Sequence, residues 1–183
     1  MKYYLPFLVI IIFLINSCSD GDIVSPAMKG DRINSSFASV IVDDQVKTKE
    51  LNLVQVIGSD VDEEGYAEEW TFIYCTVSPA DSCYYYLISS ESVELDVIEE
   101  RIIGLSVIDN SLDDLLNSNE ALAVAQKNGG EEFLKNYPGS KINVSLIKAG
   151  VPDSTPTWRI NYSYGTDLDM PVFAVDAITG ELK

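Results

Sequence analysis

Trp158-Arg159-Ile160-Asn161-Tyr162 and Trp70-Thr71-Phe72-Ile73-Tyr74 share one pattern, Trp-x-apolar-x-Tyr. In the first of these stretches apolar and polar residues alternate, which is typical of a strand with one buried face. Trp158, Ile160 and Tyr162 then lie together on the dry side of a sheet. The sequence therefore predicts two similar strands, each with a tryptophan in the core.

The surroundings of the two tryptophans also agree in order and spacing. A second strand-like run begins 14 or 15 residues after each tryptophan, and residues 85–95 align with 172–182 without a gap. Residues 51–57 and 142–147 are strand-like runs upstream of the two tryptophans. Self-similarity of this kind indicates a repeat. A β-branched segment, residues 34–42, precedes the first set and is a weak helix former.

A helix is expected on the dry face of the sheet in each half. In the second half, Asn117 or Ser118 can cap the helix start, and Glu120 lies at capping-box distance from Asn117. Gly129-Gly130 is expected to end this helix. Residues 131–136 are expected to add another turn.

Several features of the second half together resemble a PepSY domain. They are Asn119-Glu120-Ala121-Leu122, the Gly129-Gly130 break, the Trp158 strand, and the closing Val175-Asp176-Ala177-Ile178-Thr179-Gly180-Glu181. The resemblance covers about residues 112–183. The first half resembles a degenerate copy, with residues 89–94 standing where Asp-Ala-x-Thr-Gly-Glu would be.

The resemblance implies an α+β fold, a tandem repeat of a helix packed on a three- or four-stranded antiparallel sheet. Such a pair is similar to the architecture of beta-lactamase inhibitory protein, in which two repeats make one concave binding surface. The family is linked to the inhibition or regulation of peptidases and to the cell envelope, and it is not catalytic. We therefore expect a protein-binding module whose partner is an envelope protein or a peptidase.

The N-terminus is typical of a secreted, lipid-anchored protein. Lys2 precedes the apolar run 3–15, and Cys18 follows Asn16-Ser17 directly, which resembles a bacterial lipobox. Asp20 ends the run too early for a transmembrane anchor. The acidic residues behind Cys18 resemble a surface-export signal of Bacteroidota lipoproteins, although a plain tether is an equal alternative. We expect lipidation at Cys18 and an outer-membrane location, on the periplasmic face or the cell surface.

The expected division of the chain follows from these features. It is listed here by residue ranges: signal peptide 1–17, flexible tether 18–32, degenerate repeat 33–100, connector 101–111 and PepSY-like repeat 112–183. Within the connector, residues 102–108 are expected to form an additional strand or a packed linker.

Composition excludes several classes of function. The chain has 29 acidic and 12 basic residues, with a formal net charge of −17, which argues against nucleic-acid binding. It has no histidine, which removes Ser-His-Asp and Cys-His catalysis and nearly all familiar zinc sites. No pair of carboxylates is marked out for glycosidase chemistry. We expect no enzyme activity and no cofactor.

Two cysteines remain after Cys18. Cys75 and Cys83 bracket a turn-rich loop in a chain that is expected to be exported, where a disulfide can form. Their spacing matches no redox or metal motif. A structural disulfide is favoured, and two free buried thiols are the alternative.

Two further segments are candidate sites. Tyr84, Tyr85 and Tyr86 place aromatic rings on both faces of one strand, which favours partner binding, although ordinary strand propensity also explains them. The acidic loop, residues 60–65, resembles the start of a calcium loop.

The candidate metal ligands in the acidic loop are Asp60, Asp62 and Glu64. Thr71 stands where the closing glutamate of a calcium loop belongs, so a solvated hairpin loop is favoured. A calcium-responsive structural envelope protein is the alternative to the binding module.

Overall fold

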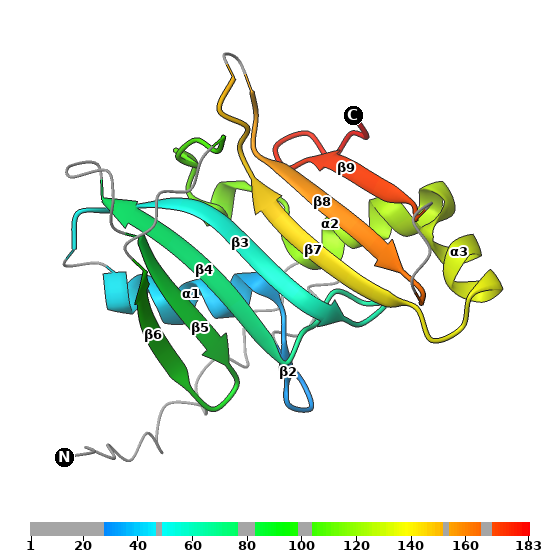
Figure 1. Ribbon diagram of the computed structural model, residues 1–183, viewed down its shortest axis with the longest axis horizontal. Helices are drawn as coiled ribbons and strands as arrows, with labels where there is room; N and C mark the ends of the chain where they lie inside the picture. Colours follow the sequence, from blue (N-terminus) through cyan, green and yellow to red (C-terminus); the bar gives the residue numbers. More distant parts are fainter. Residues whose placement is uncertain (1–27, 47–48, 77–82, 99–103, 152–153, 166–169) are drawn as a thin grey trace, which may run out of the picture.

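The computed structural model describes residues 28–46, 49–76, 83–98, 104–151, 154–165 and 170–183 (Figure 1). Cys18, the signal peptide and most of the expected tether lie outside the described residues. The first described residues form a short hairpin of β1 (Met28–Lys29) and β2 (Arg32–Ile33). Ile33 exchanges two backbone hydrogen bonds with Ala67. The end of the expected tether therefore belongs to the folded body.

One seven-stranded antiparallel sheet organises the chain. Its strand order is β6-β5-β4-β3-β7-β8-β9. The strands are β3 (Leu51–Val61), β4 (Glu69–Thr76), β5 (Cys83–Ser89), β6 (Val93–Ile98), β7 (Lys141–Ile147), β8 (Thr157–Ser163) and β9 (Val172–Asp176). The α+β class is confirmed, but the sheets expected for the two halves are joined into one sheet through the pairing of β3 with β7.

The helices lie behind the sheet in Figure 1, on one of its faces. They are listed as α1 (Ser35–Val46), the one-turn helix Leu112–Asp114, α2 (Ser118–Ala125), a π-type turn (Gln126–Gly130) and α3 (Glu131–Asn136). No helix in the described part of the chain is long and apolar enough to cross a membrane.

Capping explains where the two main helices begin. Asn117 and Glu120 form the expected capping box at the start of α2. The Asn34 side chain accepts a hydrogen bond from the Phe37 N–H at the start of α1. Each cap satisfies an N–H group that would otherwise lack a partner. The weak helix candidate of the first half is therefore a helix.

The Gly129-Gly130 pair separates two helices, so the helix that starts at Ser118 ends before it, as expected. Gly129 has a φ of 123°, which side chains rarely adopt, and this bend in the chain is followed directly by α3. Gly130 is also required, because a Cβ there would lie 2.2 Å from the Tyr162 hydroxyl. The bend turns α3 toward β9, and Phe133 and Leu134 pack against the core as expected.

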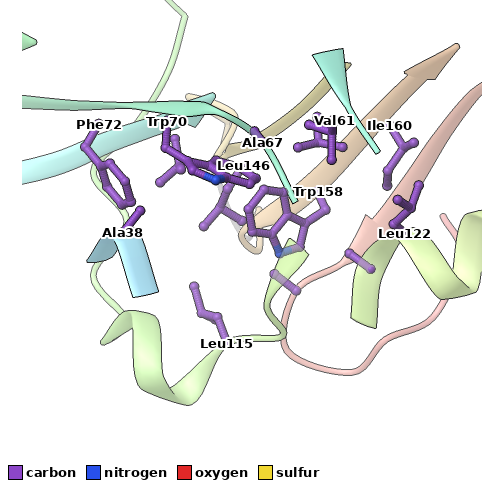
Figure 2. Close-up of a cluster of buried hydrophobic side chains, with 14 of the residues drawn as sticks. Ala38, Val61, Ala67, Trp70, Phe72, Leu115, Leu122, Leu146, Trp158 and Ile160 are labelled. Atoms are coloured by element: carbon purple, nitrogen blue, oxygen red, sulfur yellow. The ribbon is translucent and has the colours of Figure 1, made fainter. Parts of the chain in front are cut away.

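The two tryptophans meet at the centre of the core (Figure 2). Trp70 and Trp158 contact each other edge to face, with ring centroids 6.4 Å apart. The Trp70 indole donates a hydrogen bond to the Ile33 carbonyl, and the Trp158 indole donates one to the Leu116 carbonyl. Both rings are thus buried without leaving an unpaired N–H.

Strand register follows the spacing seen in the sequence. Trp70 lies opposite Ile88, and Trp158 lies opposite Val175. The gap-free alignment of 85–95 with 172–182 matches Ile88 to Val175.

The connector is a packed linker over its described residues. The Ile108 N–H donates to the carbonyl of Leu53 in β3, and the stretch from Gly104 runs along the β7–β8 loop.

A disulfide joins Cys75 to Cys83 across β4 and β5. The two residues face each other in the strand register, and their Cα atoms are 4.1 Å apart. The favoured interpretation of the sequence thus agrees with the structure, and the alternative of two free thiols does not. Strand pairing brings the two sulfurs together, since opposite residues in antiparallel strands place their side chains on the same face.

Reduction of this disulfide is expected to lower the free energy of unfolding by about 2.5 kcal/mol, because the bond restricts the unfolded chain. Urea denaturation of the full chain with and without a phosphine reductant measures the change. The Cys75→Ala/Cys83→Ala variant is the control, and its stability should not respond to reductant. Equal stability of the reduced and oxidised wild type would contradict the prediction.

Candidate functional site

The face of the sheet that the helices leave uncovered is the largest candidate surface. We call it the open face. Residues opposite each other in antiparallel strands share a face, so the strand register identifies its members. They are listed here: Glu94, Asp96, Cys83, Tyr85, Leu87, Ser89, Glu69, Thr71, Ile73, Cys75, Asn52, Gln55, Ile57, Lys141, Asn143, Ser145, Ile147, Thr157, Arg159, Asn161, Ser163, Val172, Ala174 and Asp176.

The open face has an apolar centre. Ile73 is only 3% exposed although it lies outside the main core cluster, because neighbouring side chains on the same face surround it. Tyr85, Leu87, Ile57 and Ile147 are partly buried around it. Together these residues form the kind of half-buried apolar and aromatic surface that proteins use to bind other proteins.

Charge is distributed unevenly across the open face. Glu94 and Asp96 are exposed on β6, at one edge of the sheet. Arg159 is exposed on β8 near the other edge, and it has no ion pair within the described residues. A partner on this face therefore meets negative charge at one end and positive charge at the other.

The three tyrosines do not form one surface. Tyr86 is 2% exposed, contacts Tyr74 edge to face and accepts a hydrogen bond from Lys49. Tyr84 lies on the same helix-covered face, with the Lys49 ammonium 5.6 Å from its ring centroid. Only Tyr85 lies on the open face. The interpretation of Tyr84, Tyr85 and Tyr86 as a single partner-binding set therefore needs correction, because side chains alternate along a strand.

Lysines neutralise the candidate metal ligands of the acidic loop. Lys29 contacts Glu64 at 2.7 Å and Asp62 at 3.4 Å, and Lys141 contacts Asp60 at 2.9 Å. The hydrogen bond to Glu64 and the charge of Asp62 raise the pKa of Lys29. Within the described residues, no group of three or more acidic or cysteine side chains is placed to hold a metal ion.

The acidic loop is instead a docking element between the two halves of the chain. Asp62 accepts hydrogen bonds from the N–H groups of Glu64 and Tyr66, which shape the loop as a tight turn. Its carbonyls then accept from the start and end of α2: Ser118 donates to Gly65 at 3.0 Å and Gln126 donates to Glu63 at 2.6 Å. These contacts give the loop a structural role.

The closing Asp-Ala-x-Thr-Gly-Glu segment forms a turn around Asp176. Its carboxylate accepts hydrogen bonds from the N–H groups of Ile178 and Thr179 and from the Thr155 hydroxyl, and it pairs with Lys183 at 3.1 Å. Burial raises the pKa of Asp176, but these hydrogen bonds outweigh burial and hold the pKa well below its usual range.

Asp176→Asn is expected to lower the free energy of unfolding by about 1–2 kcal/mol at pH 7, because charge-assisted hydrogen bonds are lost. The folded pKa of Asp176 is depressed, so its contribution is present above the unfolded pKa of about 4 and is lost as pH falls. The difference in the free energy of unfolding between wild type and variant should therefore become smaller below pH 4. Urea denaturation at several pH values measures this difference. Asp113→Asn, at an exposed position, is the control, and its free energy of unfolding should differ from that of the wild type by close to zero.

A second candidate surface is a shallow depression, widely open to solvent, between α3 and the edge strand β9. We call it the aromatic groove; it has a volume of about 570 Å³ and is lined by Gly129, Glu132, Phe133, Asn136, Tyr137, Met170, Pro171 and Phe173. The sequence does not predict this groove. Phe133 and Tyr137 stand four residues apart, a spacing that puts them on one side of a helix, and this signal points to it in retrospect.

Comparison of the chain with models of protein families, with curated proteins and with solved structures finds no match. The PepSY resemblance therefore rests on the residues quoted above.

Proposed function

We propose that the chain is a non-catalytic lipoprotein of the cell envelope whose folded part binds another protein through the open face, with a peptidase as the leading candidate partner. The observation that carries the proposal is a seven-stranded sheet with helices on one face only. The bare face has an apolar centre around Tyr85 and charged ends. A calcium-responsive structural role is not proposed, since the acidic loop pairs with lysines and docks on α2.

We further propose that the two halves are copies of one PepSY-like unit. The helix starts support this idea, because Asn34-Ser35 and Asn117-Ser118 occupy the same positions in α1 and α2. The buried residues then recur at the same spacing and are listed here: Ser35, Ala38, Ser39 and Val42 in α1, and Ser118, Ala121, Leu122 and Ala125 in α2.

Contacts between the halves support the same idea. The Ser35 N–H donates to the Ser118 hydroxyl, and the Ser118 N–H donates to the Ser35 hydroxyl, so the two helix starts exchange equivalent hydrogen bonds. Trp70 and Trp158 likewise contact each other from equivalent strands. Reciprocal contacts of this kind are typical of units related by a two-fold axis.

Membrane attachment is proposed from the sequence alone. A lipid on Cys18 would hold the folded body at the outer membrane by its N-terminus. Growth with a fatty-acid analogue should label the wild-type chain and should not label Cys18→Ala. Equal labelling of both would exclude this anchor.

The binding proposal is tested by cross-linking in intact envelopes with the full chain and two variants. Tyr85→Ala removes a ring from the open face, and Val40→Ala trims an exposed side chain of α1, on the other side of the sheet. Capture of one reproducible partner should fall with Tyr85→Ala and persist with Val40→Ala, at unchanged melting temperature. Equal capture of the partner by the wild type and by Tyr85→Ala would contradict the proposal that the open face is the binding surface.

A further inference from the structure

We propose that the aromatic groove binds a lysine or arginine side chain of a peptide segment in a partner. The groove lies on the helix-covered side of the sheet at the β9 edge, away from the open face. The proposal therefore does not depend on what the open face binds.

Aromatic rings make up the body of the groove. Phe133 contacts Tyr137, with ring centroids 4.8 Å apart, and Tyr137 contacts Tyr164 at 5.5 Å. Tyr162 lies beneath them and contacts both Phe133 and Phe173 at 5.7 Å. Tyr137 remains 44% exposed. The faces of such rings carry partial negative charge and attract cations that approach within about 6 Å.

A carboxylate without a partner stands at the same place. Glu132 lines the groove and is exposed, and it has no ion pair or hydrogen bond within the described residues. The formal net charge of the chain is −17, which attracts cationic partners and repels anionic ones. Rings and carboxylate together thus favour a cation with an apolar stem, which is the chemistry of lysine and arginine.

The first half of the chain contains its own version of this interaction. Lys49, just before β3, places its ammonium 5.6 Å from the centroid of the Tyr84 ring and donates a hydrogen bond to the Tyr86 hydroxyl at 3.0 Å. Tyr86 lies opposite Phe72 in β4, and Phe173 lies opposite Ile160 at the matching position in β8.

In the second half Tyr137 stands before β7, where the first half has Lys49 before β3. No lysine lies over the rings of the groove in the described part of the chain. An external cation would therefore take, beside the rings of the second half, the place that the Lys49 ammonium takes beside the rings of the first half.

The edge of the sheet beside the groove favours a peptide over a free amine. The outer edge of β9 pairs with the last residues of the chain only as far as Ala174, whose carbonyl accepts a hydrogen bond from Lys183. Alternate residues of a strand point their backbone groups the same way, so Val172 also directs its N–H and carbonyl outward. A peptide that seats a basic side chain in the groove can pair with this edge as an added strand.

The test uses the full chain in neutral detergent and a fluorescent pentapeptide with a central arginine. A matched peptide carries citrulline, which keeps the shape of arginine without its charge. The arginine peptide should bind about tenfold more tightly than the citrulline peptide, as expected for a cation that contacts both rings and a carboxylate. Equal affinity, or no binding up to about 10 mM, which corresponds to negligible affinity, would overturn the proposal.

Variants locate the interaction. Glu132→Gln and Tyr137→Leu should each weaken binding of the arginine peptide about fivefold. Glu131→Gln is the matched control, because Glu131 is also exposed but does not line the groove, and its effect should stay below about twofold, as for a distant screened charge. Equal effects of Glu131→Gln and Glu132→Gln would show that the peptide is attracted only by the overall negative charge of the chain, and would overturn the proposal. Loss of binding in Tyr85→Ala, with none in Tyr137→Leu, would assign the peptide to the open face instead.

Discussion

Replacing Trp158 by alanine is expected to lower the free energy of unfolding by about 3–5 kcal/mol. Trp158 is 2% exposed, so truncation leaves a large cavity between α2 and the sheet (Figure 2). It also leaves the partly buried Leu116 carbonyl without its indole donor, and the loss of this hydrogen bond adds to the cost. Urea denaturation followed by far-ultraviolet circular dichroism measures the loss. Val40→Ala, at a position 61% exposed, is the control and should change stability by less than about 0.5 kcal/mol.

Trp70→Ala should be similarly costly, and the pair should not be additive. The two rings contact each other, so either single change already removes their shared contact, and the double variant should lose less than the sum of the two by about 0.5–1.5 kcal/mol. Additivity of the two losses would show that the rings stabilise separate cores. A coupled loss means that the halves of the chain unfold as one unit.

The strands were predictable because their signal is local. Alternation around Trp158 and the matched spacing after each tryptophan specify which side chains face the core, and register follows from that requirement. The cap at Asn117 and the turn at Asp176 were predictable for the same reason, since each depends on residues within four positions of one another. The weak helix over 34–42 forms because its small buried face packs on the sheet, which outweighs propensity.

Features that depend on distant contacts could not be predicted in this way. The Gly129-Gly130 pair was predictable as a helix end, but the approach of the Tyr162 hydroxyl, which leaves no room for a Cβ at Gly130, was not. The acidic loop resembles the start of a calcium loop in sequence, but its ion pair with Lys29 and its hydrogen bond with the end of α2 appear only in the folded chain. Merging of the two sheets depends on the pairing of β3 with β7, about 90 residues apart along the chain.

The candidate site shows the same division. Alternation already places Tyr84, Tyr85 and Tyr86 on two faces of one strand, but only the fold shows that helices cover the face of Tyr84 and Tyr86 and leave Tyr85 on the open face. The aromatic groove combines rings from α3 and β9 with a bend between two helices. None of these parts marks a site by itself, so the groove is found only when the fold brings them together.

Gly65→Ala is expected to lower the free energy of unfolding by about 3 kcal/mol, because two penalties coincide at Gly65. Its φ is 92°, a conformation that costs a side chain about 1–2 kcal/mol. A Cβ there would also lie 2.7 Å from the Asn119 Cα and 2.9 Å from its backbone nitrogen. Backbone atoms at the start of α2 cannot rotate away, so overpacking adds about 1–3 kcal/mol.

Gly139→Ala separates the two penalties. Gly139 has nearly the same φ, 91°, but a Cβ there meets nothing within 4 Å, so this variant should lose only about 1–2 kcal/mol. Urea denaturation of both variants measures the difference, which we expect to be about 1–2 kcal/mol. Equal losses would show that the acidic loop does not press on α2. A larger loss at Gly65 would mean that close docking of this loop, which the sequence favoured as a solvated hairpin, holds the two halves of the chain together.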